Sequence, residues 1–127
     1  MHWRLTLLNG TYSVCRLGAA DVVPAWALRV AGFTSVTRTV EELSIVCQES
    51  SVPADQVRAE GGWRALKLEG PIPFEQTGVL RSLISPLADA GIGIFAVSTF
   101  DTDYVLVKGA KLERAIEALR AAGHTIL

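Results

Sequence analysis

Two groups of residues between positions 68 and 108 could bind a small charged molecule. The first is Thr77-Gly78, which precedes a segment whose apolar residues recur one, three and four positions apart, as in an amphipathic helix. The first backbone amides of such a helix have no partner within it, so they attract carboxylates and other anions. The second group is Asp101 and Asp103, in a predicted hairpin turn where they could face a cation.

Each of these residues also has a purely structural explanation. Thr77 is the predicted N-cap of the helix and Gly78 its first residue, and a glycine there can serve close packing alone. Aspartates are common in turns because their side chains bond to nearby backbone groups. The residue types alone therefore leave a binding role and a structural role open for Gly78, Asp101 and Asp103.

The elements that must position these residues follow from the spacing of apolar side chains. Continuous or alternating apolar runs predict strands, and apolar residues at helical spacing predict helices. In the second half of the chain the order is a strand, a helix ended by Gly91, two strands around a turn, a helix capped by Gly123, and a last strand. The expected ranges are Trp63–Glu69, Val79–Ala88, Ile92–Thr99, Tyr104–Val107, Leu112–Leu119 and Thr125–Leu127.

The first half of the chain has weaker signals. An Asn9-Gly10 pair between two alternating runs predicts an opening hairpin. A short or irregular helix with an early proline, two strands around a polar turn, and a short helix ended by Gly61-Gly62 are expected next. The expected ranges are Trp3–Leu7, Tyr12–Leu17, Gly18–Val30, Phe33–Arg38, Leu43–Gln48 and Pro53–Ala59.

An internal repeat relates the two halves. A shift of 61 positions lays the strand-like run 42–46 over 103–107, so that Glu42 matches Asp103. Each half then reads strand, helix, strand, strand, helix, strand, which is the ferredoxin-like βαββαβ order. We therefore predict an α+β fold of two such repeats packed together, residues 1–61 and 62–127, with antiparallel sheets and helices on one face. Sheets of this kind have open edges, which favours a homo-oligomer.

The composition limits the classes of partner. Half of the 127 residues are hydrophobic and the net charge is −1, so we expect a globular protein that binds neither nucleic acid nor an anionic membrane. The start of the sequence shows no charged segment followed by an apolar one, as a secretory signal would, so a cytoplasmic location is expected.

No set of residues suggests catalysis or metal binding. Cys15 and Cys47 lie far apart in strand-like runs, and His2 and His124 do not complete a zinc site with them at any familiar spacing. The sequence also offers no Ser-His or Cys-His pairing and no phosphate-binding loop. We therefore expect a protein that is not an enzyme and that needs no cofactor or metal.

Two segments, Phe74–Leu80 and Ser98–Val107, resemble the ACT domain, a small βαββαβ module that binds amino acids and regulates metabolic enzymes. They are similar to the last ACT domain of CASTOR-type cytosolic arginine sensors. They also resemble small bacterial tandem-ACT proteins related to the regulatory region of aspartokinases. The turn here reads Phe-Asp-Thr-Asp, whereas the arginine sensors have Phe-x-Phe-Asp, so the resemblance does not specify which amino acid is bound.

The resemblance implies a free amino acid held between two ACT domains. Its backbone groups would meet the loop before the helix and the helix amides, the slot would be lined from the hairpin, and an acid would face a cationic side chain or the α-ammonium group. The residues that match those positions are Gln76, Thr77, Gly78 and Val79 for the backbone groups, Thr99 and Phe100 for the slot, and Asp103 for the acid.

Two hypotheses of different classes follow. The first is a regulatory module that binds a free amino acid and reports it by associating with itself or with a protein partner. The second is a structural or oligomerisation domain without a ligand, in which the sheet edges pair to make a dimer.

Overall fold

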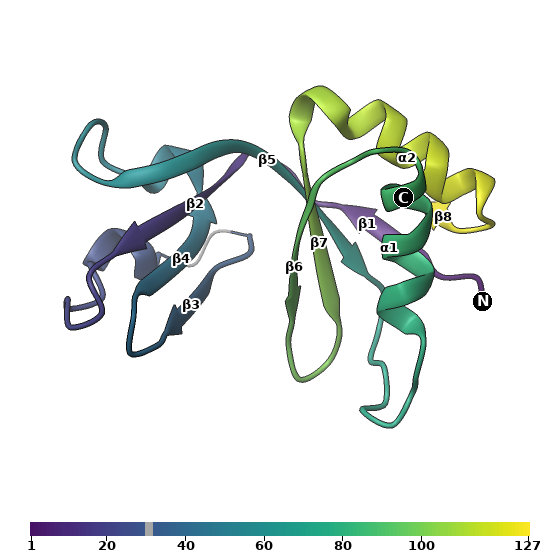
Figure 1. The fold of residues 1–127 in the computed structure, drawn as a ribbon, viewed down its shortest axis with the longest axis horizontal. Coiled ribbons are helices and arrows are strands. Elements are labelled where there is room, and N and C mark those ends of the chain that lie inside the picture. Colours follow the sequence, from purple (N-terminus) through teal and green to yellow (C-terminus); the bar gives the residue numbers. More distant parts are fainter. Residues whose placement is uncertain (30–31) are drawn as a thin grey trace. The chain divides into compact units, whose positions relative to one another are not determined.

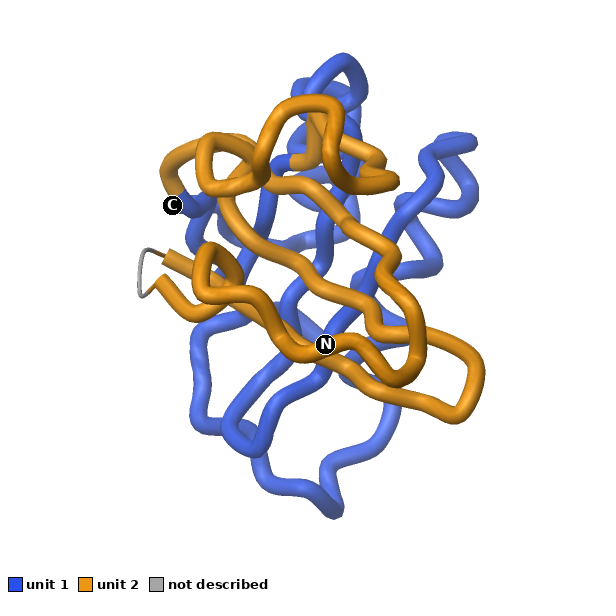
Figure 2. Tube along the Cα trace, turned by 90° about the vertical axis from the view of Figure 1, so that its left-hand side faces the viewer, with its two compact units in different colours: residues 1–8, 64–127 blue, residues 9–63 orange. Residues whose placement is uncertain are grey.

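A computed structural model describes residues 1–29 and 32–127. The chain forms two compact units, which Figure 2 shows in different colours. The N-terminal unit is residues 9–63, and the C-terminal unit combines residues 1–8 with 64–127. Strand β5 (Arg58–Leu68) contributes to both, because its first part pairs with β2 and its last part with β1.

The N-terminal unit is a four-stranded antiparallel sheet in the order β3-β4-β2-β5. Its other elements are β2 (Tyr12–Leu17), η1 (Ala25–Leu28), β3 (Ser35–Arg38), β4 (Leu43–Gln48) and η2 (Glu49–Ser51). Both helices of the βαββαβ order are thus reduced to single 3₁₀ turns. One of these turns still contributes to a small core, which contains Cys15, Ala27, Leu43, Ile45 and Cys47.

The C-terminal unit has the complete order, with two α-helices over one face of its sheet (Figure 1). Its strands follow the order β6-β7-β5-β1-β8, in which only β1 and β8 are shown to run parallel. The elements are β1 (Arg4–Leu7), α1 (Val79–Asp89), β6 (Ile94–Ser98), β7 (Asp103–Lys108), η3 (Gly109–Lys111), α2 (Leu112–Ala121) and β8 (Thr125–Ile126). The core between helices and sheet includes Leu66, Leu68, Leu83, Leu87, Val105, Val107 and Leu119.

The α+β fold of two ferredoxin-like repeats is confirmed, but several local predictions are wrong. The opening hairpin does not form, because β1 pairs with β5 and β8 while β2 pairs with β4 and β5. This pairing places the first eight residues in the C-terminal unit, and the predicted boundary at residues 61 and 62 falls inside β5. The segment Pro53–Ala59 is not a helix, since η2 ends at Ser51 and β5 begins at Arg58.

The helix expected over Gly18–Val30 is also much shorter than predicted. Among the described residues of that range only η1 is helical, and Val30 itself lies outside the described part. Pro24 stands directly before η1 as its N-cap residue, where a missing N–H costs little. No helix in the described residues is both long and apolar enough to cross a bilayer.

The two hairpin turns correspond at a shift of 60 residues, not 61. The Thr39 N–H donates to the Glu42 carbonyl at 2.9 Å, and the Thr99 N–H donates to the Thr102 carbonyl at 2.8 Å. Strands β4 and β7 then begin at Leu43 and Asp103. Asp103 is therefore equivalent to Leu43, and the predicted match with Glu42 is wrong by one residue. In a strand, a shift of one residue moves each side chain to the opposite face of the sheet.

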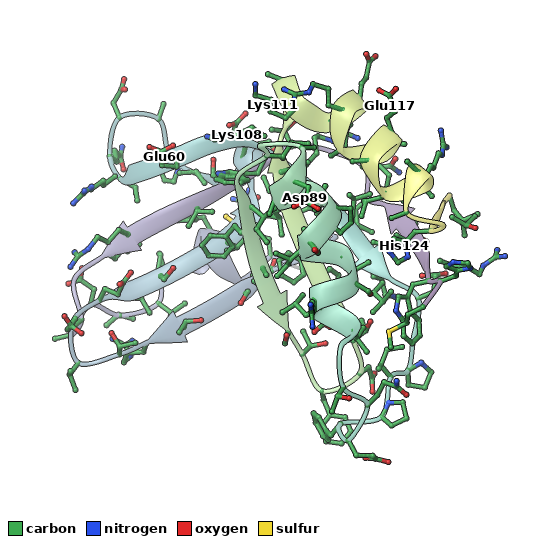
Figure 3. The ribbon with its side chains drawn as sticks, turned by 45° about the vertical axis from the view of Figure 1, so that its right-hand side comes forward. Glu60, Asp89, Lys108, Lys111, Glu117 and His124 are labelled. Atoms are coloured by element: carbon green, nitrogen blue, oxygen red, sulfur yellow. The ribbon has the colours of Figure 1, made fainter. Side chains whose placement is uncertain are left out.

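Helix α1 contains Pro86, whose missing N–H leaves the Ser82 carbonyl without its usual partner in the helix. The buried ring of His124 (Figure 3) takes that place, with its Nε2 atom 2.9 Å from the Ser82 oxygen. The backbone N–H of Trp3 donates to Nδ1 of the same ring at 3.1 Å. Nδ1 is therefore the acceptor, and Nε2 carries the proton. One imidazole therefore joins α1 to β1.

Candidate ligand-binding site

A cavity of about 180 Å³ lies in the C-terminal unit between the loop 69–78, the start of α1 and the turn joining β6 to β7. Pockets for drug-sized ligands are typically ~300–1,000 Å³, so this cavity suits a small metabolite or part of a larger ligand. Its lining residues are Ile72, Pro73, Phe74, Gln76, Val79, Ser98, Thr99, Phe100, Thr102 and Asp103.

Hydrogen bonds hold the two walls of the cavity together. The Ile72 N–H donates to the Asp101 carbonyl at 2.7 Å, and the Thr102 hydroxyl donates to the Leu68 carbonyl at 2.6 Å. Thr102 is only 6% exposed, so its bond is shielded from water. The loop and the turn are therefore fixed to each other before any ligand arrives.

Gly70 permits this close approach. A Cβ atom at Gly70 would lie 2.9 Å from the Asp101 carbonyl oxygen and 3.2 Å from the Ile72 nitrogen, both backbone atoms that cannot rotate away. Sequence reasoning missed Gly70, Ile72 and Thr102 as parts of the site. A Gly-Pro pair such as Gly70-Pro71 is typical of a turn, but no neighbouring residue indicates that this turn meets a hairpin thirty residues later.

Asp103 is the only charged residue among the described residues that line the cavity. One of its oxygens, Oδ1, accepts a hydrogen bond from the Ser98 hydroxyl at 2.5 Å. In the described part of the chain the carboxylate makes no second hydrogen bond, and the side chain is half-buried. The second oxygen thus remains available to a donor from a ligand.

The helix start differs from the prediction. Gly78, not Thr77, is the N-cap residue, and α1 begins at Val79 with the Ser82 N–H donating to the Gly78 carbonyl at 3.1 Å. Gly78 has a φ of 75°, a left-handed conformation that side chains disfavour. Space is not the reason for glycine, because a Cβ there would meet only Met1 Cε, at 3.8 Å.

Two phenylalanines form the outer rim of the cavity. The rings of Phe74 and Phe100 make an edge-to-face contact, with centroids 4.8 Å apart and planes at 80°. The side chains are nevertheless 71% and 78% exposed, respectively. Each ring therefore contacts the other while most of its surface faces water.

The structure thus brings together five of the seven predicted site residues. Gln76, Val79, Thr99, Phe100 and Asp103 line one cavity, whereas Thr77 and Gly78 are exposed beside it and do not line it. Asp101 contributes its backbone carbonyl, through the bond to Ile72, rather than a place in the lining.

The cysteines lie elsewhere, in the core of the N-terminal unit. Cys15 and Cys47 are free thiols on the neighbouring strands β2 and β4. A hydrogen bond between them, together with burial, raises the pKa of Cys15, while the same hydrogen bond lowers the pKa of Cys47. The described residues contain no group of three or more His, Cys, Asp or Glu side chains that could hold a metal ion.

Two family models match the chain. The ACT domain model matches residues 58–121, half of the chain, and a model of an N-terminal domain matches residues 10–55. The human protein CASTOR3P is 32% identical over 87 residues, covering 59% of this chain and 53% of that protein. The bovine "Cytosolic arginine sensor for mTORC1 subunit 1" is 30% identical over 97 residues, covering 68% of this chain and 30% of that protein.

This chain therefore spans only about half, or less, of the length of those relatives.

Among solved structures, protein Atu0741 from Agrobacterium tumefaciens is 48% identical, with a TM-score of 0.93 over 100% of this chain and 93% of that one. The regulatory subunit of aspartate kinase from Thermus flavus is 12% identical, with a TM-score of 0.63 over 93% and 95%, and thus shares the fold. From these similarities and the order of its C-terminal elements, the chain belongs to the ACT domain family.

Proposed function

We propose that this ACT protein binds a free amino acid in the cavity between loop 69–78 and the β6–β7 turn, and that it acts as a regulator rather than an enzyme. One observation carries the proposal: a small preformed cavity whose only charged lining group, among the described residues, is the half-buried carboxylate of Asp103. Such a carboxylate favours a ligand with an ammonium or guanidinium group.

The other predicted residues have distinct roles in this proposal. Val79 begins α1, so its end of the cavity can accept the α-carboxylate at the positive end of the helix. Gln76 and Thr99 offer polar side chains, and Phe100 offers an apolar wall. Thr77 and Gly78 act indirectly, because the left-handed turn at Gly78 sets where the helix begins.

The name of one relative supports this class of ligand. The bovine protein that is 30% identical is named as a cytosolic arginine sensor. We propose a cytoplasmic location and a homo-oligomer whose copies associate through the open edges of their sheets. A protein partner that reads the bound state would complete the regulatory role.

A ligand screen followed by two matched substitutions tests the site. We expect one or more of the twenty amino acids, with a cationic one strongest, to raise the melting temperature of the full chain and to give a calorimetric binding signal. Asp103→Asn should weaken the best cationic ligand about ten- to a hundredfold, since a charge-assisted hydrogen bond contributes ~1.5–3 kcal/mol.

Asp101→Asn is the matched control, because Asp101 lies in the same turn but does not line the cavity. Its effect should be much smaller. Equal weakening by both substitutions, or a preference for an acidic amino acid, would contradict the role of Asp103.

A structural domain without a ligand is the second candidate. The large exposed surfaces of Phe74 and Phe100 favour it, because exposed aromatic pairs are typical of contact surfaces. No thermal shift with any amino acid, together with a stable oligomer by light scattering, would support this candidate instead.

A further inference from the structure

The rim of the cavity carries features that ligand binding does not require. It consists of the exposed rings of Phe74 and Phe100 and of the exposed acidic residues that follow them in the sequence, Glu75 and Asp101. We propose that this acidic aromatic rim is a docking site for another protein, through a segment that carries arginine or lysine next to aliphatic side chains. The inference goes beyond the proposed function, since docking does not need a bound amino acid.

The aromatic pair provides the apolar part of such an interface. Phe74 and Phe100 expose most of their surface, although phenylalanine is usually buried. Aromatic residues are enriched at the energetic centres of protein interfaces. The two rings also fix each other through their edge-to-face contact at 4.8 Å, so little side-chain freedom is lost on binding.

The charge of the rim indicates the partner's chemistry. The segments 69–78 and 98–103 contain Glu69, Glu75, Asp101 and Asp103 and no lysine, arginine or histidine, so their formal charge is −4. The whole chain has a charge of only −1, which leaves the remaining residues at +3. A basic segment would approach this rim with favourable steering, and a guanidinium group could stack on an exposed phenyl face.

The same charge argues against a second copy of this chain as the occupant. In a symmetric dimer the same patch faces itself, so Glu75 and Asp101 would lie close to the same acidic residues of the second copy. Like charges at the centre of an interface are unfavourable. A different protein with positive charge is therefore the occupant that the rim fits.

The rim is also built as a rigid surface. The bonds from Ile72 to Asp101 and from Thr102 to Leu68 join its two segments, and Gly70 allows their backbones to approach closely. A preformed surface avoids the entropic cost of ordering loops when a partner binds. Because Phe74 and Phe100 also line the cavity, an occupied cavity and a docked partner would contact the same two rings.

Synthetic peptides can test the docking site without knowledge of the natural partner. The probe is a peptide of alternating arginine and leucine, titrated at low salt into the isotope-labelled full chain and followed by NMR. We expect shift changes concentrated in residues 69–78 and 98–103. A peptide with glutamate for arginine should not bind, and one with serine for leucine should bind at least about tenfold more weakly.

Matched variants locate the effect. The double variant Phe74→Ser with Phe100→Ser, and the double variant Glu75→Lys with Asp101→Lys, should each weaken the peptide about tenfold or more. Val40→Ser is the control, because Val40 is 96% exposed in the equivalent turn of the N-terminal unit and lies beside Glu41 and Glu42. It should leave peptide binding unchanged.

Several outcomes would overturn the inference. These are shift changes outside the two segments, equal binding of the serine peptide, or an effect of Val40→Ser as large as that of the phenylalanine pair. A dimer that dissociates when both phenylalanines are replaced would show that a second copy covers the rim. Amino-acid binding is measured on the unsubstituted chain beside the peptide titrations, so intact amino-acid binding without any peptide binding rejects this inference alone.

Discussion

The hairpin turns of the two units share one backbone design but have different surroundings. Thr39 and Thr99 close the two turns with the same hydrogen bonds. In the N-terminal unit the residue before this threonine is Arg38, whose guanidinium donates to the carbonyls of Ala19 and Asp21 in the facing loop. In the C-terminal unit the equivalent residue is Ser98, whose hydroxyl donates a hydrogen bond to Asp103 in its own hairpin.

This difference shows that the same hairpin turn can lie against a loop in one unit and beside a cavity in the other. In the N-terminal unit the long Arg38 side chain reaches from the turn to the facing loop, whereas the short Ser98 side chain of the C-terminal unit does not. Next to the serine there is a cavity of about 180 Å³, whereas the arginine makes the loop contact itself. Whether this frame holds a cavity therefore depends on the side chains around the turn more than on the repeat that supports them.

Transferring the arginine should have the largest effect. Ser98→Arg is expected to place a long cationic side chain in the cavity next to Asp103 and to weaken amino-acid binding by about a hundredfold or more, measured by calorimetry. Ser85→Arg, on the exposed surface of α1, is the control for added charge. Unchanged affinity in the Ser98 variant would mean that the ligand binds outside this cavity.

Disturbing the contact between loop and turn should have the next largest effect. Gly70→Ala places a methyl group against the Asp101 carbonyl, so we expect the free energy of unfolding to fall by about 1–3 kcal/mol in urea titrations. Gly93→Ala is a matched control, because a Cβ atom there meets nothing within 4 Å. Equal stability of the two variants would show that the contact between loop 69–78 and the β6–β7 turn does not contribute to the free energy of unfolding.

The smallest effect is expected from removing the arginine of the N-terminal unit. Arg38→Ala deletes two hydrogen bonds at an exposed site, so it should lower stability by only about 0.5–1 kcal/mol. Faster amide hydrogen exchange should be confined to the loop 18–21, and amino-acid binding should not change. Loss of ligand binding in this variant would contradict the assignment of the site to the C-terminal unit.

The sequence predicted elements whose signals are local. Helices α1 and α2 were identified from apolar spacing, and Gly91 and Gly123 were correctly placed after their ends, where both have positive φ. The opening hairpin failed for the opposite reason. Asn9-Gly10 is a good local turn signal, but β1 pairs with β5 on one side and β8 on the other, which no neighbouring residue reveals.

The residues of the candidate site could likewise be predicted only where their signals are local. A helix start and an acidic turn indicated Val79 and Asp103, and both line the cavity. The N-cap was wrong by one residue, because the left-handed conformation at Gly78 replaces a threonine cap. Gly70 and Thr102 could not be found, since their role arises from contacts between segments about thirty residues apart in the sequence.

The imidazole of His124 makes helix α1 dependent on residues far from it in the sequence. The acceptor that Pro86 leaves free at Ser82 is satisfied only when the turn before β8 is in place, and the same ring is held by Trp3 beside β1. Fraying of either strand would leave a part-buried carbonyl in the middle of the helix without its hydrogen-bond partner, at a cost of about 1–3 kcal/mol. The first strand, the last strand and α1 should therefore open and close as one cooperative unit, although residues 8–124 separate the two strands in the sequence.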